Sequence, residues 1–225
     1  MKKIFFLFAI VAAAVACSTG VKQQPEAVVP MTLDKFETIA LPAPDTLGGI
    51  PLLAAMQHRK TDRQFDEKNL SLKHLSEILW AANGVNRPDG KRTVPSAMAK
   101  FPIITYAFLA NGVYLYSPEN HTLMPVIEGD FRELTGMQPF VKIAPLNLVF
   151  IADYTKYGDR PMPAEQRIWF ASLDAGHCCQ NVYLYCASAG LRSVERAMAD
   201  GAKLLELLEL DPATHQFIIS QTVGY

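Results

Sequence analysis

The stretch Arg59-Lys60-Thr61-Asp62-Arg63-Gln64-Phe65 decides how the rest of this chain is interpreted. It places three cations and a hydroxyl within five residues, directly after an apolar segment. Guanidinium forks, an ammonium and a hydroxyl held close together are what a phosphate group needs. The stretch is therefore a candidate phosphate-binding motif. The alternative is a solvated basic turn, in which Arg63 pairs with Asp62 or Asp66 at the surface.

A second motif, Arg92-Thr93-Val94-Pro95-Ser96-Ala97, follows some thirty residues later. Its final turn, Pro95-Ser96-Ala97, can bring backbone N–H groups and a small hydroxyl against a flat polar ring. The alternative is an ordinary proline turn without a ligand. Short motifs of this kind are hypotheses whose test is their structural context.

The first residues have the pattern of a signal peptide and not of a folded element. Lys2 and Lys3 precede an uncharged apolar run over residues 4–16, which is too short to span a bilayer comfortably. The junction Ala14-Val15-Ala16-Cys17 resembles a bacterial lipobox, although the common leucine is replaced by alanine. This resemblance implies cleavage before Cys17 and its lipidation, with acyl chains that anchor the protein. The alternative is a plain secretory signal and a chance cysteine.

The sequence thus predicts a signal peptide over residues 1–16, a lipidated Cys17 with a flexible tether over 17–40, and one folded domain over 41–225. The expected location is outside the cytoplasm, lipid-anchored to the cell envelope on the periplasmic side or in the outer membrane. Removal of the leader takes away two lysines, so the formal net charge falls from −1 to −3. This charge gives no reason to expect a nucleic-acid partner.

The other cysteines, Cys178, Cys179 and Cys186, lie within nine residues of one another. Adjacent cysteines are poor partners for a disulfide. His177 stands beside them, but no second Cys/His pair occurs at ligand spacing elsewhere. The sequence therefore predicts no metal site, and the three thiols are expected to be packing groups of a buried helix.

Apolar periodicity predicts four helices. The first begins at Pro51, with Leu52, Leu53 and Met56 facing inward. The others are expected over residues 72–82, 164–189 and 201–210, the second of these ending at Gly190. Because the helix over 164–189 carries apolar residues on nearly all sides, it is expected to be buried nearly all round.

Strand-like runs alternate with these helices. They cover residues 103–109, 113–116, 146–152 and 216–223, and Asn111-Gly112 joins the first two as a hairpin. The segment 122–141 shows no clear pattern apart from a short helix around Asp130–Leu134. The interleaved elements predict an α+β fold with a central mixed or antiparallel sheet flanked by helices.

In their order and spacing, the two motifs and these elements resemble the nitroreductase family of flavin enzymes, over roughly residues 47–225. Several stretches are similar to its SagB-type branch, which includes flavin dehydrogenases that oxidise thiazolines to thiazoles. These stretches are Leu79-Trp80-Ala81-Ala82-Asn83-Gly84-Val85-Asn86, Arg92-Thr93-Val94-Pro95-Ser96-Ala97, Gly112-Val113-Tyr114-Leu115-Tyr116, Asp174-Ala175-Gly176-His177 and Gln180-Asn181. The resemblance implies a nitroreductase-like homodimer with FMN bound at the subunit interface.

The resemblance also implies which residues bind FMN. They are Arg59, Lys60, Thr61, Arg63, Pro95, Ser96, Ala97, Glu195, Arg196 and Ala197. The basic motif would hold the phosphate, the ribityl chain and one ring edge, with Arg63 where a cation stabilises the anionic reduced flavin. The Pro-Ser-Ala turn would meet the ring, in many relatives from the partner subunit. The segment Ser193–Ala197 would direct backbone N–H groups toward N5 and O4.

Two departures from the family pattern stand out. The sequence ends at Gly224-Tyr225, where many relatives carry a further basic residue that contacts the phosphate. Met98-Ala99-Lys100-Phe101-Pro102 stands where many nitroreductases have Asn and a Gln-Pro-Trp sequence. The sequence identifies no catalytic acid or base, and the polar candidates are Lys100, Tyr106, His121 and Tyr154.

The resemblance implies an FMN-dependent oxidoreductase that moves a hydride between the flavin and a small organic substrate of heterocyclic, nitro or quinone-like type. The alternative is a non-catalytic, membrane-anchored lipoprotein that uses the same fold as a binding or scaffold module.

Overall fold

A computed structural model of the chain describes residues 29–159 and 161–225. The expected signal peptide, Cys17 and the first half of the expected tether lie outside the described residues. Within the described ranges, no helix has both the length and the apolar character needed to cross a membrane.

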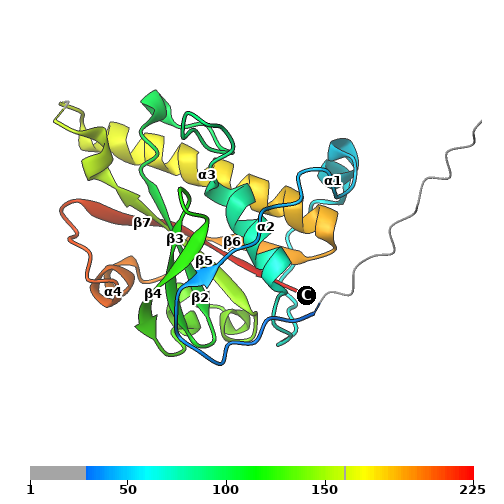
Figure 1. The fold of residues 1–225 in the computed structure, drawn as a ribbon. Helices are drawn as coiled ribbons and strands as arrows, with labels where there is room; N and C mark the ends of the chain where they lie inside the picture. Colours follow the sequence, from blue (N-terminus) through cyan, green and yellow to red (C-terminus); the bar gives the residue numbers. More distant parts are fainter. Residues whose placement is uncertain (1–28, 160) are drawn as a thin grey trace, which may run out of the picture.

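One seven-stranded sheet organises the fold, in the order β1-β4-β3-β2-β5-β7-β6 (Figure 1). All neighbouring pairs among the described strands run antiparallel. Of the two predicted kinds of sheet, mixed and antiparallel, the structure therefore has the antiparallel one. The strands are β1 (Ile39–Ala40), β2 (Ile103–Leu109), β3 (Gly112–Ser117), β4 (Thr122–Glu128), β5 (Leu146–Asp153), β6 (Arg192–Arg196) and β7 (His215–Gly224).

Helices cover both faces of this sheet. Side chains alternate between the faces along each strand, so neighbouring residues of one strand join different cores. On β2, Ala107 joins the larger apolar core with α2 and α3, whereas Tyr106 and Phe108 join a smaller core with α4. Figure 1 shows α2 and α3 lying together on one side of the sheet, away from α4. The helices are α1 (Leu52–His58), α2 (Leu72–Asn83), α3 (Ala164–Ala189) and α4 (Gly201–Leu207). The predicted α+β fold is confirmed.

The long helix α3 has the predicted bounds and ends at Gly190, which adopts the left-handed conformation with φ of 69°. Its inward side is small and apolar, with Ala171, Ala175 and the three cysteines packed in the larger core. Its other side leaves Trp169 exposed over 59% of its surface, with Ile168 and Leu173 also exposed. The prediction of burial nearly all round is therefore wrong for the single chain.

The predicted orientation of α1 is also wrong. Leu52, Leu53 and Met56 are exposed, Leu53 over 78% of its surface, and Ala55 is the buried residue of this helix. α1 has only seven residues, and the side that contacts α3 is the one with the small residue Ala55. Its large apolar side chains are left on the surface.

The folded part begins earlier than the predicted boundary at residue 41. The backbone N–H of Met31 donates to the carbonyl of Leu70 at 2.8 Å, and Asn69 donates to the Met31 carbonyl at 3.2 Å. The short strand β1 then pairs with β4. Residues 31–40 therefore belong to the fold and are not a flexible tether.

Candidate functional site

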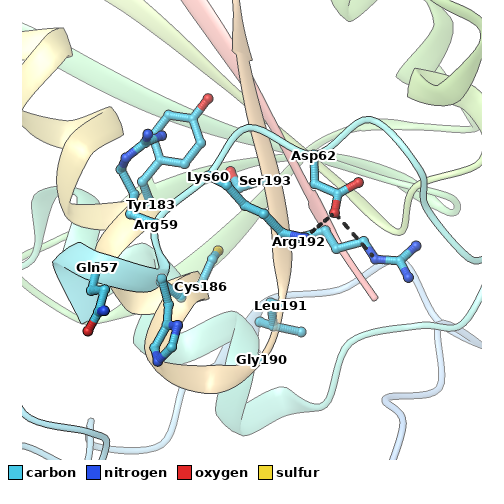
Figure 2. A pocket seen from close by; sticks show the side chains of 12 residues that line it. Gln57, Arg59, Lys60, Asp62, Tyr183, Cys186, Gly190, Leu191, Arg192 and Ser193 are labelled. Carbon is cyan, nitrogen blue, oxygen red and sulfur yellow. Dashed lines mark ion pairs between the residues drawn. The ribbon is translucent and has the colours of Figure 1, made fainter. Parts of the chain in front are cut away.

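A cavity of about 540 Å³ lies where the chain leaves α1, beside the end of α3 and the start of β6 (Figure 2). This volume suits a small-molecule or cofactor site. The cavity is lined by Gln57, His58, Arg59, Lys60, Asp62, Tyr183, Cys186, Ala187, Gly190, Leu191, Arg192 and Ser193. Three residues of the first sequence motif, Arg59, Lys60 and Asp62, therefore lie on one wall of a cavity.

The electrostatics of the wall favour an anion. The Asp62 carboxylate lies between two cations of this wall, with Oδ2 at 3.4 Å from Lys60 Nζ and 3.9 Å from Arg192 Nε (Figure 2). Burial opposes ionisation of Asp62, but the Gln64 backbone N–H and Lys60 outweigh it and hold the pKa of this carboxyl below its usual range. The wall thus carries one carboxylate and three cations, Arg59, Lys60 and Arg192, which leaves a net positive charge.

Tyr183 of α3 joins the basic motif to β6. The Arg59 guanidinium lies over its ring, 5.3 Å from the centroid. Its hydroxyl is 3.2 Å from Thr61 Oγ1 and accepts the backbone N–H of Glu195 at 2.9 Å. Sequence reasoning missed Tyr183, because only its place on the side of α3 that meets Arg59 reveals its role.

The basic motif also continues the sheet edge. The backbone N–H of Asp62 donates to the Ser193 carbonyl at 2.9 Å, on the side of β6 that no strand covers among the described residues. Since β7 pairs with the other side of β6, the motif is fixed by backbone as well as by side chains. A rigid backbone at this point keeps the cations in place.

The predicted binding residues of the basic motif are partly brought together. Arg59 and Lys60 line the cavity. Thr61 does not line it, but its hydroxyl contacts that of Tyr183, which does. Arg63 is exposed and outside the lining. Within the described part of the chain it forms no ion pair with Asp62 or Asp66, so the surface pairing considered for it is not seen.

Arg196 of β6 was predicted to bind the cofactor, but its side chain points into the protein, so only its backbone is left for that role. The side chain is 6% exposed and donates to the Thr135 carbonyl at 2.8 Å, Asn147 Oδ1 at 3.1 Å and Thr222 Oγ1 at 2.6 Å. These partners hold the guanidinium inside the protein, where burial lowers its pKa to about 10. Glu195 and Ala197, in contrast, are exposed.

The turn Pro95-Ser96-Ala97 does not line this cavity. Ser96 contacts Asp174 of α3, whereas Arg59 stacks on Tyr183, nine residues further along the same helix. At 1.5 Å per residue this separates the two contact points by about 14 Å. A single chain thus leaves the two sequence motifs at different places along α3.

None of the four polar candidates for catalysis lines the cavity. Lys100 is exposed on the turn, and Tyr106 is buried in the smaller core. The Tyr154 hydroxyl donates to Gln216 Oε1 at 2.6 Å. His121 takes part in a polar network, with Nε2 2.7 Å from Ser76 Oγ and Nδ1 2.9 Å from the Tyr116 hydroxyl.

The His121 network predicts a dependence of stability on pH. Burial lowers the pKa of His121, against a smaller opposing effect of the Pro42 carbonyl. The unfolded chain therefore binds a proton at higher pH than the folded one, and stability is lost as pH falls through the ordinary value near 6.5. We expect the urea midpoint to fall between pH 7 and 5.5, and to fall less steeply in His121→Gln. Equal slopes in the two proteins would contradict this assignment.

The three cysteines are free and buried, as the sequence predicts. Burial raises the pKa of the Cys178, Cys179 and Cys186 thiols, which keeps them protonated. Cys186 reaches the cavity wall. Within the described ranges, no group of three His, Cys, Asp or Glu side chains is placed to hold a metal ion.

Comparison with known proteins identifies the class to which this fold and cavity belong. The model of the nitroreductase family matches residues 56–225. A nitroreductase-family protein of Methanocaldococcus jannaschii is 31% identical over 188 residues, which cover 77% of this chain and 91% of that protein. The chain belongs to the nitroreductase family.

Solved structures agree with this assignment. A nitroreductase-family protein of Ralstonia eutropha JMP134 is 40% identical, with a TM-score of 0.79 over 89% of this chain and 95% of its own. The fold also matches a nitroreductase-family protein of Desulfovibrio desulfuricans in complex with FMN, at 21% identity and a TM-score of 0.56, over 79% of this chain and 87% of that one. Proteins of this family bind FMN and act as oxidoreductases.

Proposed function

We propose that this protein is an FMN-dependent oxidoreductase that transfers a hydride between the flavin and a small organic substrate. The observation that carries the proposal is the cationic cavity at Arg59 and Lys60, beside the open edge of β6. When bound, the flavin supplies the hydride chemistry, and the protein supplies binding and orientation.

The residues of the cavity fit this cofactor. Arg59, Lys60 and Arg192 provide charged donors for a phosphate, and the Tyr183 ring braces Arg59. The backbone N–H of Glu195 lies on the uncovered side of β6, where Tyr183 binds it. Because this bond occupies the Glu195 N–H, its part in the site is to hold Tyr183, and with it Arg59, against β6.

The stretches that resemble the SagB-type branch would suit a heterocyclic substrate, with nitro and quinone-like compounds as alternatives within the same chemistry. The segment Met98-Ala99-Lys100-Phe101-Pro102 departs from the pattern of many nitroreductases. Since this segment follows the turn expected to meet the ring, we infer that the substrate pocket differs from that of a typical nitroreductase.

We further propose that the active form is a homodimer. In the single chain, the Pro-Ser-Ala turn and the basic motif contact α3 about 14 Å apart and share no cavity. The exposed apolar residues of α1 and α3 provide a surface for a second copy. A turn donated by the partner subunit would then complete the site.

The experiment that tests this function is flavin binding by the purified protein. We expect FMN to bind and give a flavin absorbance spectrum that dithionite bleaches and air restores. Dithionite is the reductant in this test, because NAD(P)H is not expected at the location outside the cytoplasm that is proposed below. Failure to bind FMN at micromolar concentrations would contradict the proposal and favour the non-catalytic scaffold module.

The proposed location is the cell envelope, with Cys17 as the lipidated residue. This rests on the junction Ala14-Val15-Ala16-Cys17 behind a basic, apolar leader. We expect Cys17→Ser to abolish lipidation, because the serine lacks the thiol that carries the first lipid, and to leave the protein unprocessed or unanchored. Incorporation of labelled palmitate measures this, and equal labelling of the wild type and the variant would refute lipidation at Cys17.

A further inference from the structure

The segment after the second motif has a strained backbone. Three of the four residues from Met98 to Phe101 have positive φ, namely Met98 at 55°, Ala99 at 53° and Phe101 at 47°. None of them is glycine, and a residue with a side chain in this conformation has a strained backbone. Such a turn persists only where the surrounding structure holds it, so the contacts that do so are significant.

Ser96 provides one of these contacts. The backbone N–H of Phe101 donates to Ser96 Oγ at 2.8 Å, and Ser96 Oγ donates to Asp174 Oδ2 at 2.6 Å. A hydroxyl has a single proton, so the direction of this chain of hydrogen bonds is fixed. The bond from Phe101 to Ser96 closes the turn, and the bond from Ser96 to Asp174 attaches the turn to α3.

Asp174 gives the contact a rigid base. It is 4% exposed and sits within the 26-residue helix α3, between Ala171 and Ala175 of the larger core. As an ionised carboxylate it only accepts hydrogen bonds, which matches the donors that face it. Burial raises the pKa of Asp174, and the bonds from Ser96 and the Ala97 backbone oppose that shift.

This arrangement changes the role expected for Ser96. Its hydroxyl is turned toward α3, and both its proton and one lone pair are in use. It is therefore not the group that meets a flat polar ring, as the sequence suggested. The residues that the turn presents to the outside are Met98 and Lys100, both exposed.

We propose that Ser96 and Asp174 are positioning residues, which hold the 96–101 turn in its strained form and so shape the substrate side of the flavin site. The second half of this inference rests on the proposed function, since it takes the turn to lie over the flavin of a partner subunit. The first half concerns the turn alone and holds with or without FMN.

The first test is hydrogen exchange of the Phe101 amide in the full protein without added flavin. We expect exchange at least 10-fold faster in Ser96→Ala, and near-wild-type exchange in Ser96→Thr, which restores the hydroxyl. The matched control is Ser188→Ala, because Ser188 lies on α3 and its hydroxyl likewise accepts a backbone N–H, from Ile50. Unchanged Phe101 exchange in Ser96→Ala overturns the proposal, and Asp174→Ala, which removes the acceptor of the Ser96 proton, carries the same test if Ser96→Ala does not fold.

The second test uses the FMN-loaded protein and 1,4-benzoquinone as the probe. The quinone takes two electrons from dithionite-reduced flavin and two protons, which yields hydroquinone and oxidised flavin. We expect Ser96→Ala to need about 5–10 times more quinone for half-saturation, with the limiting rate within twofold of wild type and rescue by Ser96→Thr. Faster Phe101 exchange without this shift overturns the role at the substrate, whereas failure to load FMN counts against the proposed function alone.

Discussion

Replacing Arg59 with alanine is expected to weaken FMN binding by about 1.5–3 kcal/mol, the contribution of a hydrogen bond to a charged group. This corresponds to a loss of roughly 10- to 150-fold in affinity. Arg59 has the largest expected effect in the basic motif, because its guanidinium lines the cavity and is held over the Tyr183 ring, 5.3 Å from the centroid. Its orientation is thus set before the phosphate arrives.

Equilibrium titration with FMN measures this loss. The control is Lys203→Ala, which removes a cation from α4, on the other face of the sheet. Lys203 already pairs with Asp200 at 3.2 Å at the surface, so its removal should leave the affinity unchanged. Arg59→Lys keeps the charge but loses the planar fork, and an intermediate affinity is expected. If Arg59→Ala and Lys203→Ala retain FMN equally after dialysis, the phosphate does not bind at this motif.

Most of the fold could be predicted from the sequence, because its long elements carry strong local signals. The apolar steps of α3 and the left-handed Gly190 fixed both ends of that helix. The Asn-Gly hairpin between β2 and β3 and the continuous apolar run of β5 were equally clear. In each case the local pattern and the tertiary environment favour the same structure.

Three strands, β1, β4 and β6, were missed for physical reasons. β1 has only two residues. β4 contains Pro125 and carries apolar residues on both of its faces, with Met124 and Val126 exposed, so it shows no alternation of apolar and polar residues. Its proline is tolerated at an irregular register next to β3. β6 has only five residues, two of them arginines and one a glutamate, and its pairing with β7 comes from tertiary structure. None of the three strands would be found by apolar periodicity.

The site was predictable in its residue types but not in its geometry. The basic motif does line a cavity, yet Tyr183, which braces it, has no local signature. Arg196 was expected at the cofactor, and only its position on an edge strand shows that its side chain turns inward to Asn147 and Thr222. Side-chain direction on a strand depends on the register, which a single sequence does not reveal.

Replacing Leu53 with aspartate is expected to convert the proposed homodimer into monomers and to release FMN. An obligate interface of this kind should bury well over 2,000 Å² in total. A carboxylate placed without a partner inside it would cost roughly 3–5 kcal/mol, which weakens association by about two to four orders of magnitude. Leu53 is 78% exposed in the single chain, so the variant should fold normally.

The loss of FMN should follow from the loss of the dimer, because a ligand that binds only the assembled site stabilises it by mass action. Light scattering and flavin absorbance on the same samples measure both effects. Val126→Asp, at an exposed apolar position of β4, is the matched control and should change neither. For the wild type, removal of the flavin should lower the thermal midpoint and raise the monomer fraction. A monomeric Leu53→Asp protein that still binds FMN tightly would show that one chain builds the whole site, and the partner-donated Pro95-Ser96-Ala97 turn would have to be abandoned.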